Sequence, residues 1–413
     1  MPTSIGGSQR TNLLHRALSE LGEVEMIVLS SATRYTEEQW RVMKDRFGLV
    51  GRIHLPKAFE RSPWKYLPLP QRWKNKLGHN VEGSRRLLAT DPRLKNALES
   101  MVDLSRYDVV VGRYARSIAA LGLHENAKPP VVLDIDDWDP DKYRSRLSGK
   151  VSAWERLILG WHLRNIEKAS PSVIAGTRAQ WVSNPSNLEE PLVSRARLLP
   201  NIPFEAEGSD LGDFPLPEGK VLMTIGSYQH RPNALGVDWF LNEVWPMVVA
   251  AEPGATFRVY GSHLSSSMRD RWSRVKNVEV IGFVDTVEEA YRNAVATVCP
   301  VNDGAGTNIK ILESLRHGRH CFSTTTGARG FDDLVEEDVV GAFSDAETMA
   351  RAIVESLGNR QRLPDLGERG RTLVEERYSY AMFSTVVREG IEDALGRSIG
   401  GAPIAQERRK ALV

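Results

Sequence analysis

The residues from Asp303 to Gly318, D-G-A-G-T-N-I-K-I-L-E-S-L-R-H-G, are of types that could bind a phosphate. Gly304 and Gly306 allow positive φ angles and a close approach of a ligand to the backbone. Thr307 or Asn308 can cap a following helix, and the free N–H groups at a helix start form an anion site. A glycine turn that opens a helix therefore suits a phosphate group.

Two charged side chains follow this turn. Lys310 and Glu313 lie three residues apart, so they share one face of a helix that Gly318 can end. A cation beside a phosphate-binding turn suggests a nucleotide, with the phosphate charge bound by Lys310 and the ribose hydroxyls by Glu313. The alternative is a surface salt pair on an ordinary βαβ unit, and the motif alone leaves both open.

Composition limits the class of protein. A chain of 413 residues with 41% hydrophobic and 26% charged residues predicts a globular protein of two or three domains. The net charge of +1 gives no general attraction to nucleic acid. Cys299 and Cys321 fall in predicted strands, which indicates buried thiols in a reducing compartment rather than a disulfide framework. With neither a signal region nor a long apolar run, we expect a cytoplasmic protein.

The elements that must position these residues alternate between strand and helix. In the first half we expect strands at 24–29, 49–54, 108–111, 131–135, 172–175 and 195–199, and helices at 13–21, 37–47, near Ser117, at 154–169 and from Arg178. In the second half we expect strands at 221–225, 257–260, 278–281, 295–299, 321–324 and 341–343, with helices near 235–251, 265–275, 287–294, 308–317, 346–357 and 375–395. This alternation predicts an α/β protein with two doubly wound domains facing across a cleft, and ligands at the carboxyl ends of the strands.

A change of composition separates the halves. Residues 202–219 are rich in proline, glycine and acidic residues and have no periodicity, which is typical of a linker. We therefore predict a first domain over 1–203, a linker over 204–219 and a second domain over 220–376. A last helix over 377–398 and a disordered tail over 399–413 complete the division.

One segment differs from the rest in charge. Residues 52–95 hold eleven Lys and Arg against three acidic residues, with Trp64 and Trp73 interleaved. Basic charge mixed with tryptophan suits peripheral association with an anionic membrane. An ordinary solvated insertion, with its aromatic side chains folded inward, fits the pattern equally well. Nucleic acid is less favoured because no recognised binding motif accompanies the charge.

Seven short motifs, in the same order, resemble those of family 4 glycosyltransferases, which have the GT-B fold. They are Gly6 to Arg10, Leu199-Pro200-Asn201, Ile225-Gly226-Ser227 with Arg231-Pro232-Asn233, Val259-Tyr260-Gly261 with Val280 to Asp285, the turn and helix at 304–318, Thr324 to Gly330, and Tyr378-Ser379-Tyr380. The third and fifth resemble the branch that assembles polysaccharides. The resemblance covers nearly the whole chain.

The resemblance implies transfer of a sugar from a nucleotide diphosphate donor to a saccharide or lipid-linked acceptor, with retention at the anomeric carbon. It implies Rossmann-like domains, a last helix that crosses back to the first domain, and neither a cofactor nor a metal. The implied catalytic residues are Lys310, Arg231 and Asp136. The implied donor-binding residues are Gly226, Ser227, Asn233, Asp303, Gly304, Ala305, Gly306, Thr307, Asn308 and Glu313. A loop of Gly6, Gly7, Ser8 and Arg10 is implied at the acceptor or phosphate.

Three departures from the family pattern matter. Ala305 stands where the first glutamate of an E-x7-E element is usual, so that contact is missing or comes from Asp303. Ser227 and Pro232 replace a widespread Arg and Lys pair, and we expect Arg231 and Lys310 to substitute for that pair. The family also has a strand before its opening glycines, whereas here the chain begins at the loop.

The roles of the other candidate side chains are less specific. Asp136 or Asp137 at a strand end could face the donor sugar or acceptor, while helix capping or a salt bridge to Arg144 is the alternative. His230, His317 and His320 lack metal-ligand spacing and fit packed or surface histidines. Two rival functions remain. One is a nucleotide-sugar epimerase or phosphorylase of the same fold, and the other is a catalytically silent binding subunit, which Ala305 favours.

Overall fold

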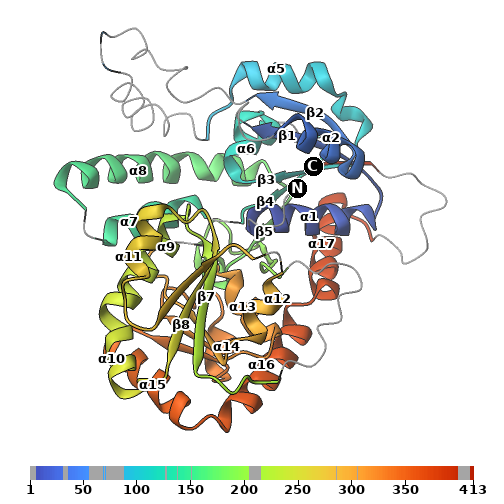
Figure 1. Cartoon of the computed structure of the whole chain (residues 1–413). Helices are drawn as coiled ribbons and strands as arrows, with labels where there is room; N and C mark the ends of the chain where they lie inside the picture. Colours follow the sequence, from blue (N-terminus) through green and yellow to red (C-terminus); the bar gives the residue numbers. More distant parts are fainter. Residues whose placement is uncertain are drawn as a thin grey trace. The chain divides into compact units, whose positions relative to one another are not determined.

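The computed structural model describes residues 6–30, 36–54, 68, 70, 88–125, 128–136, 138–149, 151–203, 215–284, 286–304, 306–398 and 410–413, with side chains from Gln9 onward. It divides into two compact units, each built on one parallel sheet flanked by helices (Figure 1). The first unit comprises Thr11–Pro200 and Phe383–Val413. The second comprises the described residues up to Arg10 and Asn201–Met382. The prediction of an α/β chain with two Rossmann-like domains is confirmed.

The strands of the first unit are β1 (Glu23–Ser30), β2 (Leu49–His54), β3 (Val109–Arg113), β4 (Val131–Asp134), β5 (Ala179–Val182), β6 (Arg197–Leu198) and β13 (Lys410–Leu412). Its helices are α1 (Gly6–Ser19), whose first turn belongs to the second unit, α2 (Glu37–Phe47), α5 (Pro92–Met101), α6 (Ala115–Ala120), α7 (Asp139–Ser148), α8 (Ala153–Ala175) and most of α17 (Tyr380–Leu395). Short 3₁₀ turns lie at Leu104–Arg106, Leu123–Glu125 and Pro185–Glu189.

The strands of the second unit are β7 (Val221–Ser227), β8 (Thr256–Ser262), β9 (Val278–Gly282), β10 (Ala296–Cys299), β11 (Cys321–Thr324) and β12 (Val340–Phe343). Its helices are α9 (Arg231–Trp239), a π-helical turn (Phe240–Val244), α10 (Trp245–Ala251), α11 (Ser266–Trp272), α12 (Val287–Arg292), α13 (Ile309–Arg316), α14 (Asp332–Glu336), α15 (Ala346–Gly358) and α16 (Arg362–Arg377).

The sheet of the first unit takes its central strand from the end of the sequence. Its order is β2-β1-β13-β3-β4-β5-β6, and β13 pairs in parallel with β1 on one side and β3 on the other. Leu412 is buried among the core side chains of this unit. The prediction of a disordered tail over 399–413 is therefore wrong for Lys410–Leu412, because the gap between β1 and β3 offers these residues backbone partners on both sides.

The sheet of the second unit has the order β12-β11-β10-β7-β8-β9. The chain leads from β7 outward through β8 and β9, and then returns to the other side of β7 with β10. Strands β7 and β10 are thus neighbours from which the connections run in opposite directions. In a parallel α/β sheet such a switch point opens a crevice at the carboxyl ends of the strands, where ligands bind.

Apolar spacing explains how the helices cover these sheets. In α2 the spacing of Trp40, Met43 and Phe47 puts all three on one face, and they pack against Met26 of β1. In the second unit Met349 and Ile353 of α15 join the core formed with β7 and β8. Tyr291 of α12 belongs to a smaller core that contains Met223 of β7. In each core the helix side chains pack against the strands and fix the position of the helix on the sheet.

Three local predictions are wrong. Residues 172–175 form the end of α8 rather than a strand, because Ser170, Val173 and Ile174 continue the buried face of that helix. The segment from Arg178, predicted as a helix, contains β5. The long helix expected at 375–395 is two helices, since α16 ends at Arg377 and α17 begins at Tyr380.

Helix α17 packs closely on the first unit from Phe383 onward. A Cβ atom at Gly390 would lie 2.3 Å from Nε1 of Trp181 in β5, so glycine is required at this contact. Arg197 adds ion pairs to Glu389 and Asp393, with N–O distances of 2.5 and 2.7 Å.

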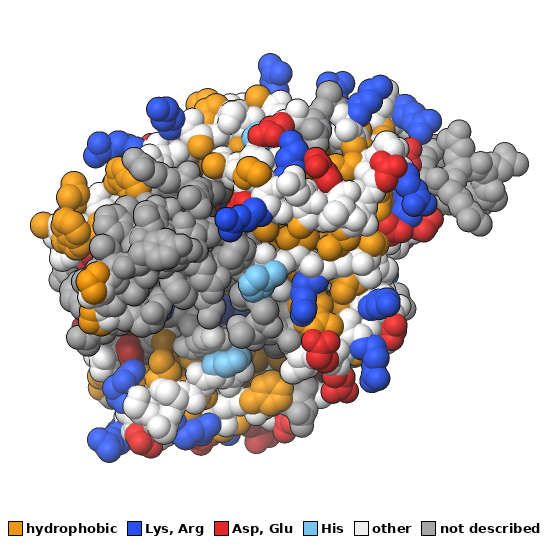
Figure 2. Space-filling view, turned by 90° about the horizontal axis from the view of Figure 1, so that it is seen from above, with side chains coloured by type: hydrophobic (Ala, Val, Ile, Leu, Met, Phe, Trp, Pro, Cys, Tyr) orange, Lys and Arg blue, Asp and Glu red, His pale blue; other side chains and the backbone are white. Residues whose placement is uncertain are grey.

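Most of the basic segment 52–95, for which membrane association is predicted, lies outside the described residues. Among the described helices, none combines the length and hydropathy of a membrane-spanning segment. Figure 2 shows one face of the molecule, where hydrophobic side chains gather near one edge and charged side chains of both signs are spread over much of the rest.

Candidate functional site

The glycine turn follows β10 at the switch point of the second sheet. Gly304 has a φ angle of +127°, a conformation that side-chain-bearing residues rarely adopt. Asp303 is half-buried and Gly306 is exposed, while Ala305 lies outside the described residues. Arg329 holds the turn by donating to the carbonyl of Gly304 at 3.4 Å. The turn is thus placed where a ligand can meet the carboxyl edge of the sheet.

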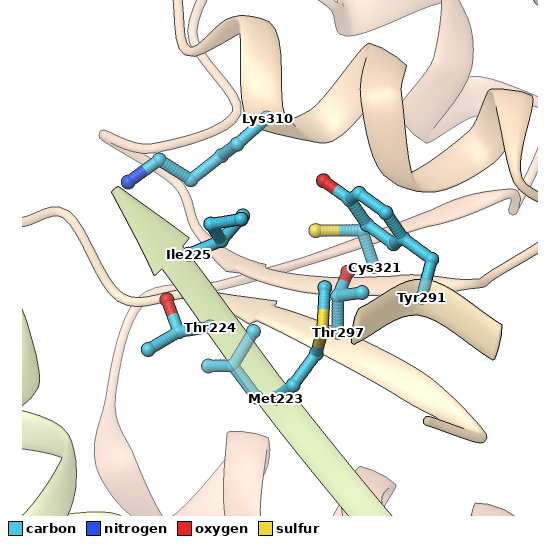
Figure 3. A pocket seen from close by; sticks show the side chains of 8 residues that line it. Met223, Thr224, Ile225, Tyr291, Thr297, Lys310 and Cys321 are labelled. Atoms are coloured by element: carbon cyan, nitrogen blue, oxygen red, sulfur yellow. The ribbon is translucent and has the colours of Figure 1, made fainter. Parts of the chain in front are cut away.

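Lys310 reaches from α13 to the end of the neighbouring strand β7 (Figure 3). Its Nζ donates to Oδ1 of Asn233 at 2.8 Å, and Nδ2 of Asn233 donates to the carbonyl of Ser227 at 2.9 Å. A Cβ atom on Gly226 would lie 3.3 Å from Nζ of Lys310, so the glycine leaves room for the ammonium group. No ion pair joins Lys310 to a carboxylate in the part of the chain that the structure describes. Its charge is oriented by an amide and stays available to an anion.

A chain of hydrogen bonds supports the turn from behind. Asn201 donates to Oγ1 of Thr307 at 3.1 Å, and Arg10 donates to Oδ1 of Asn201 at the same distance. Arg10 is only 1% exposed. The predicted loop Gly6, Gly7, Ser8 and Arg10 is helical, since α1 begins at Gly6, and Arg10 acts as a buried support for Asn201.

The start of α13 lacks a side-chain cap. Asn308 occupies the N-cap position, but its side chain donates to the carbonyl of Gly327 at 2.8 Å instead of accepting from the helix. The prediction that Thr307 or Asn308 caps this helix is therefore wrong. The consequence favours ligand binding, because no N-cap side chain competes for the first N–H groups of the helix.

Glu313 lies one turn after Lys310 and is half-buried. Burial raises the pKa of its carboxyl group, while Lys310 and the hydroxyl of Tyr291 oppose that shift. The Tyr291 hydroxyl lies 3.4 Å from Oε2 of Glu313, and its ring stacks on His317 with centroids 4.2 Å apart. Glu313 is thus held in place but keeps acceptor capacity for further hydroxyl groups.

A small cavity lies beneath the site, between Lys310 and Tyr291 (Figure 3). Its wall includes Met223 and Ile225 of β7, Thr297 of β10 and Cys321 of β11 among other residues. The volume of about 10 Å³ is close to that of one water molecule. The cavity is too small for a nucleotide.

Two further predicted residues lie on the β7 side of the site. Arg231 is the first residue of α9, and its side chain is exposed. Oγ of Ser227 lies 3.2 Å from Nδ1 of His263, a residue with a positive φ angle of 59° after β8. The structure thus brings Gly226, Ser227 and Asn233 together with Lys310.

Asp136 belongs to a different cluster, in the first unit. Its Oδ2 accepts from Arg113 at 2.5 Å and from the Tyr114 hydroxyl at 3.1 Å. Arg113 also donates to Asp134 at 3.0 Å and to Thr11. Burial alone would lower the pKa of Arg113, but the two aspartates raise it. Arg144 forms its ion pairs with Asp141, Glu167 and Glu190, so the alternative of a salt bridge from Asp136 to Arg144 is wrong, and Asp137 lies outside the described residues. The assignment of Asp136 as catalytic stays a prediction.

The cluster also contains two non-glycine residues in the left-handed region. Tyr114 has a φ angle of 64° and Asp136 one of 52°, at the ends of the adjacent strands β3 and β4. Such conformations persist only where surrounding contacts impose them. The sequence had no motif for Arg113, Tyr114 or Tyr291. A signal for Arg113 was its position two residues after the buried β-branched run Val109–Val111, at the end of the strand.

Among the described residues, no group of three or more His, Cys, Asp or Glu is arranged to hold a metal ion. Cys299 and Cys321 are buried thiols whose pKa values are raised by burial. His317 and His320 are buried, and burial lowers the pKa of each to about 4, so both are neutral at physiological pH.

Comparison with known proteins bears on this site. Residues 219–359, which include Gly226, Asn233, Lys310 and Glu313, match the family model described as "Glycosyl transferases group 1". A curated relative, an uncharacterized 44.6 kDa protein in the cps region of Klebsiella pneumoniae, is 23% identical over 177 residues. The match spans 41% of this chain and 45% of that protein, so less than half of the relative is covered.

Solved structures share the fold. HepE from Anabaena, solved in complex with UDP-glucose, matches with a TM-score of 0.59 and 10% identity over 94% of this chain and 96% of its own. WaaG, a glycosyltransferase involved in lipopolysaccharide biosynthesis, matches with a TM-score of 0.53 and 14% identity over 89% and 99%. TarM from S. aureus matches with a TM-score of 0.53 and 13% identity over 72% of this chain and only 58% of its own. These likenesses show a shared fold, and the family model covers residues 219–359.

Proposed function

We propose that this protein is a retaining glycosyltransferase of family 4 that moves a sugar from a nucleotide diphosphate donor to a saccharide or lipid-linked acceptor. The observation that carries the proposal is the position of Lys310. Among the residues that the structure describes, Lys310 has no carboxylate partner, and it lies beside a glycine turn and an uncapped helix start at the switch point of a parallel sheet.

The chemistry follows from what these groups can do. The bond between the anomeric carbon and the donor phosphate breaks, and the bond between that carbon and the acceptor oxygen forms. The departing diphosphate gains negative charge, which Lys310, Arg231 and the first N–H groups of α13 would stabilise. The acceptor proton passes to an oxygen of that phosphate, on the face of the sugar that the acceptor attacks. Fixed, preorganised charge thus replaces a protein nucleophile.

The donor would extend along the same edge of the sheet. Glu313, held by Tyr291, would accept from the ribose hydroxyls, and Gly226 and Ser227 would line the path of the diphosphate. Asp303 or another group would take the place of the glutamate that Ala305 lacks. We propose that the reaction needs no metal, and that Asp136 in the first unit serves the sugar or acceptor.

The setting we propose is surface polysaccharide assembly on the cytoplasmic side of a membrane. The relative from a cps region supports this, and so does the likeness to a protein of lipopolysaccharide biosynthesis. The basic segment 52–95 supports peripheral association with anionic lipid.

A test begins with donor turnover. The protein is incubated with a panel of nucleotide sugars, and released nucleoside diphosphate is measured with and without a chelator. We expect slow hydrolysis of one donor that Lys310→Ala and Glu313→Ala abolish and that the exposed-site control Lys276→Ala retains. Loss of activity with the chelator would contradict metal independence.

Two outcomes would change the proposal. Donor binding, seen as a raised melting midpoint, without turnover on any acceptor would favour the silent binding subunit. A product with inverted anomeric configuration in its proton NMR spectrum would contradict retention. Conversion of one nucleotide sugar into its epimer would favour the epimerase.

A further inference from the structure

Helix α8 of the first unit presents large hydrophobic side chains to solvent. Trp154 is 64% exposed and Leu157 is 61% exposed, in the first turns of the helix. Trp161 follows at the same helical face, one turn after Leu157, and is partly exposed. Because these three residues are spaced i, i+3 and i+7, they form one apolar stripe along the helix.

The stripe is not needed to hold the helix in place. The opposite face of α8 is buried in the first unit through Leu159, His162 and Ile166. At the start of the helix Ser152 and Glu155 form a reciprocal capping box. Polar residues at the stripe would leave these contacts intact. Large apolar side chains without a folding role are typical of an interaction surface.

Basic side chains continue the same face. At 100° per residue, Arg164 and Lys168 fall on the side of Leu157, and both are exposed. The exposed face of α8 therefore changes along its length from apolar to cationic.

The charge of the two halves of the chain points the same way. Residues 1–200 contain 31 Lys and Arg against 22 Asp and Glu, a net charge of +9. Residues 201–413 contain 23 against 31, a net charge of −8. The overall charge of +1 conceals this asymmetry. Residues 52–95, with eleven basic and three acidic residues, account for +8 of the +9, so the asymmetry favours an anionic partner for the first half of the chain without locating that partner at α8.

We propose that this face of α8 docks the protein on an anionic lipid bilayer. Tryptophan favours the boundary between headgroups and acyl chains, leucine adds apolar insertion, and Arg and Lys meet the lipid phosphates. Figure 2 shows hydrophobic side chains gathered at the left edge of its view, on the side to which α8 extends in Figure 1. The inference extends the membrane part of the proposed function from residues 52–95 to a described surface.

The first test measures co-sedimentation with vesicles of phosphatidylcholine alone and of phosphatidylcholine with phosphatidylglycerol. Wild type should bind the anionic vesicles, and Trp154→Ser/Leu157→Ser should bind at least tenfold more weakly. The matched control is Val42→Ser/Val50→Ser, which removes two hydrophobic side chains, 50% and 42% exposed, elsewhere on the first unit. The control should bind like wild type.

The second test removes charge. Arg164→Gln/Lys168→Gln should weaken binding to anionic vesicles about 30-fold, with no change for neutral vesicles. Arg41→Gln/Lys44→Gln on α2, also exposed, is its control and should have a smaller effect. Added salt should weaken wild-type binding.

Three results would overturn the proposal. They are no binding of wild type to anionic vesicles, equal loss in the apolar variant and its control, or unchanged lipid binding with altered self-association of Trp154→Ser/Leu157→Ser in sedimentation velocity. A nucleotide-induced rise in melting midpoint shows that each variant is folded. Because no transfer is measured, failure here is distinct from failure of the proposed enzyme activity.

Discussion

The two units place charged side chains at the ends of their strands, but they compensate those charges differently. In the second unit Lys310 donates to the amide of Asn233. In the first unit Arg113 lies between two carboxylates, 3.0 Å from Asp134 and 2.5 Å from Asp136. A cation that is oriented by a neutral group can still bind an anionic ligand. The charge of a cation between two aspartates is already compensated within the fold.

The sheets differ in a second way. All six strands of the second sheet come from one continuous stretch, Val221–Phe343. The first sheet has at its centre Lys410–Leu412, which arrives after the whole second unit. The sheet of the second unit is therefore continuous in sequence, while the first sheet depends on strands from both ends of the chain.

The largest effect is expected at the compensated cluster. Arg113→Leu leaves Asp134, whose side chain is fully buried, and Asp136 without their cation. We expect a loss of about 3–5 kcal/mol in the free energy of unfolding, measured by urea titration. The exposed Arg178→Leu should cost less than about 1 kcal/mol.

A compensating variant sharpens this prediction. Asp134→Asn and Asp136→Asn, added to Arg113→Leu, remove the unpaired charges and should restore part of the lost stability. If the triple variant is as unstable as the single one, packing rather than charge compensation explains the role of Arg113.

The next largest effect is expected at Lys310, and it is a loss of activity rather than a loss of stability. Lys310→Met should lower kcat/KM for the donor by about 10²–10³, because it removes charge stabilisation of the departing diphosphate. The free energy of unfolding should change by less than about 1 kcal/mol, because no ion pair is broken. A loss of stability as large as that of Arg113→Leu would erase the contrast between the two units.

A smaller effect is expected at β13, the strand that lies between β1 and β3 in the first sheet. Leu412 is 3% exposed, and Leu412→Ala should lower the stability by about 2–3 kcal/mol through the cavity it leaves. Thermal unfolding of this variant against Val42→Ala, an exposed site, measures the difference. Equal midpoints for the two variants would show that β13 does not support the first unit.

The smallest effect is a pH dependence at Glu313. Burial raises the pKa of this group above its ordinary value of 4.5. Below the raised pKa the carboxyl is protonated and accepts less well from ribose hydroxyls, so KM for the donor should rise several-fold as pH falls through it. The stability that protonated Glu313 contributes is full below 4.5 and is lost as pH rises through the raised pKa.

Glu313→Gln is the check on this assignment. Its KM should be higher at neutral pH and should not change with pH over the same range. If KM of the variant keeps the wild-type pH dependence, another group titrates, and Glu313 is not the residue that binds the donor.

Local pattern was sufficient for much of the fold. The bounds of α2, β2 and β11 follow from capping residues and apolar spacing, and the structure has them as predicted. Pattern was insufficient at residues 172–182, where a short apolar run fits a strand or a helix equally well. Only the continued buried face of α8 decides between them.

The candidate site likewise contains features that the sequence predicts and contacts that it does not predict. The glycines, Lys310 and Glu313 are local to one turn and one helix, so their spacing predicts a shared face. The hydrogen bond from Lys310 to Asn233 joins residues 77 apart, and that from Arg10 to Asn201 joins residues 191 apart. One sequence contains no signal for such pairs. The family resemblance assigned Asn233 to the donor site, but it gave Asn201 no role there.

The sequence by itself determined the alternation of strands and helices, the glycine turn and the types of the groups that follow it, because these depend on neighbours within a few residues. The tertiary structure decided which charges stay available and which are neutralised, and it brought Lys410–Leu412 into the first sheet. Those outcomes depend on burial and on backbone partners from distant segments, which exist only once the sheets have formed.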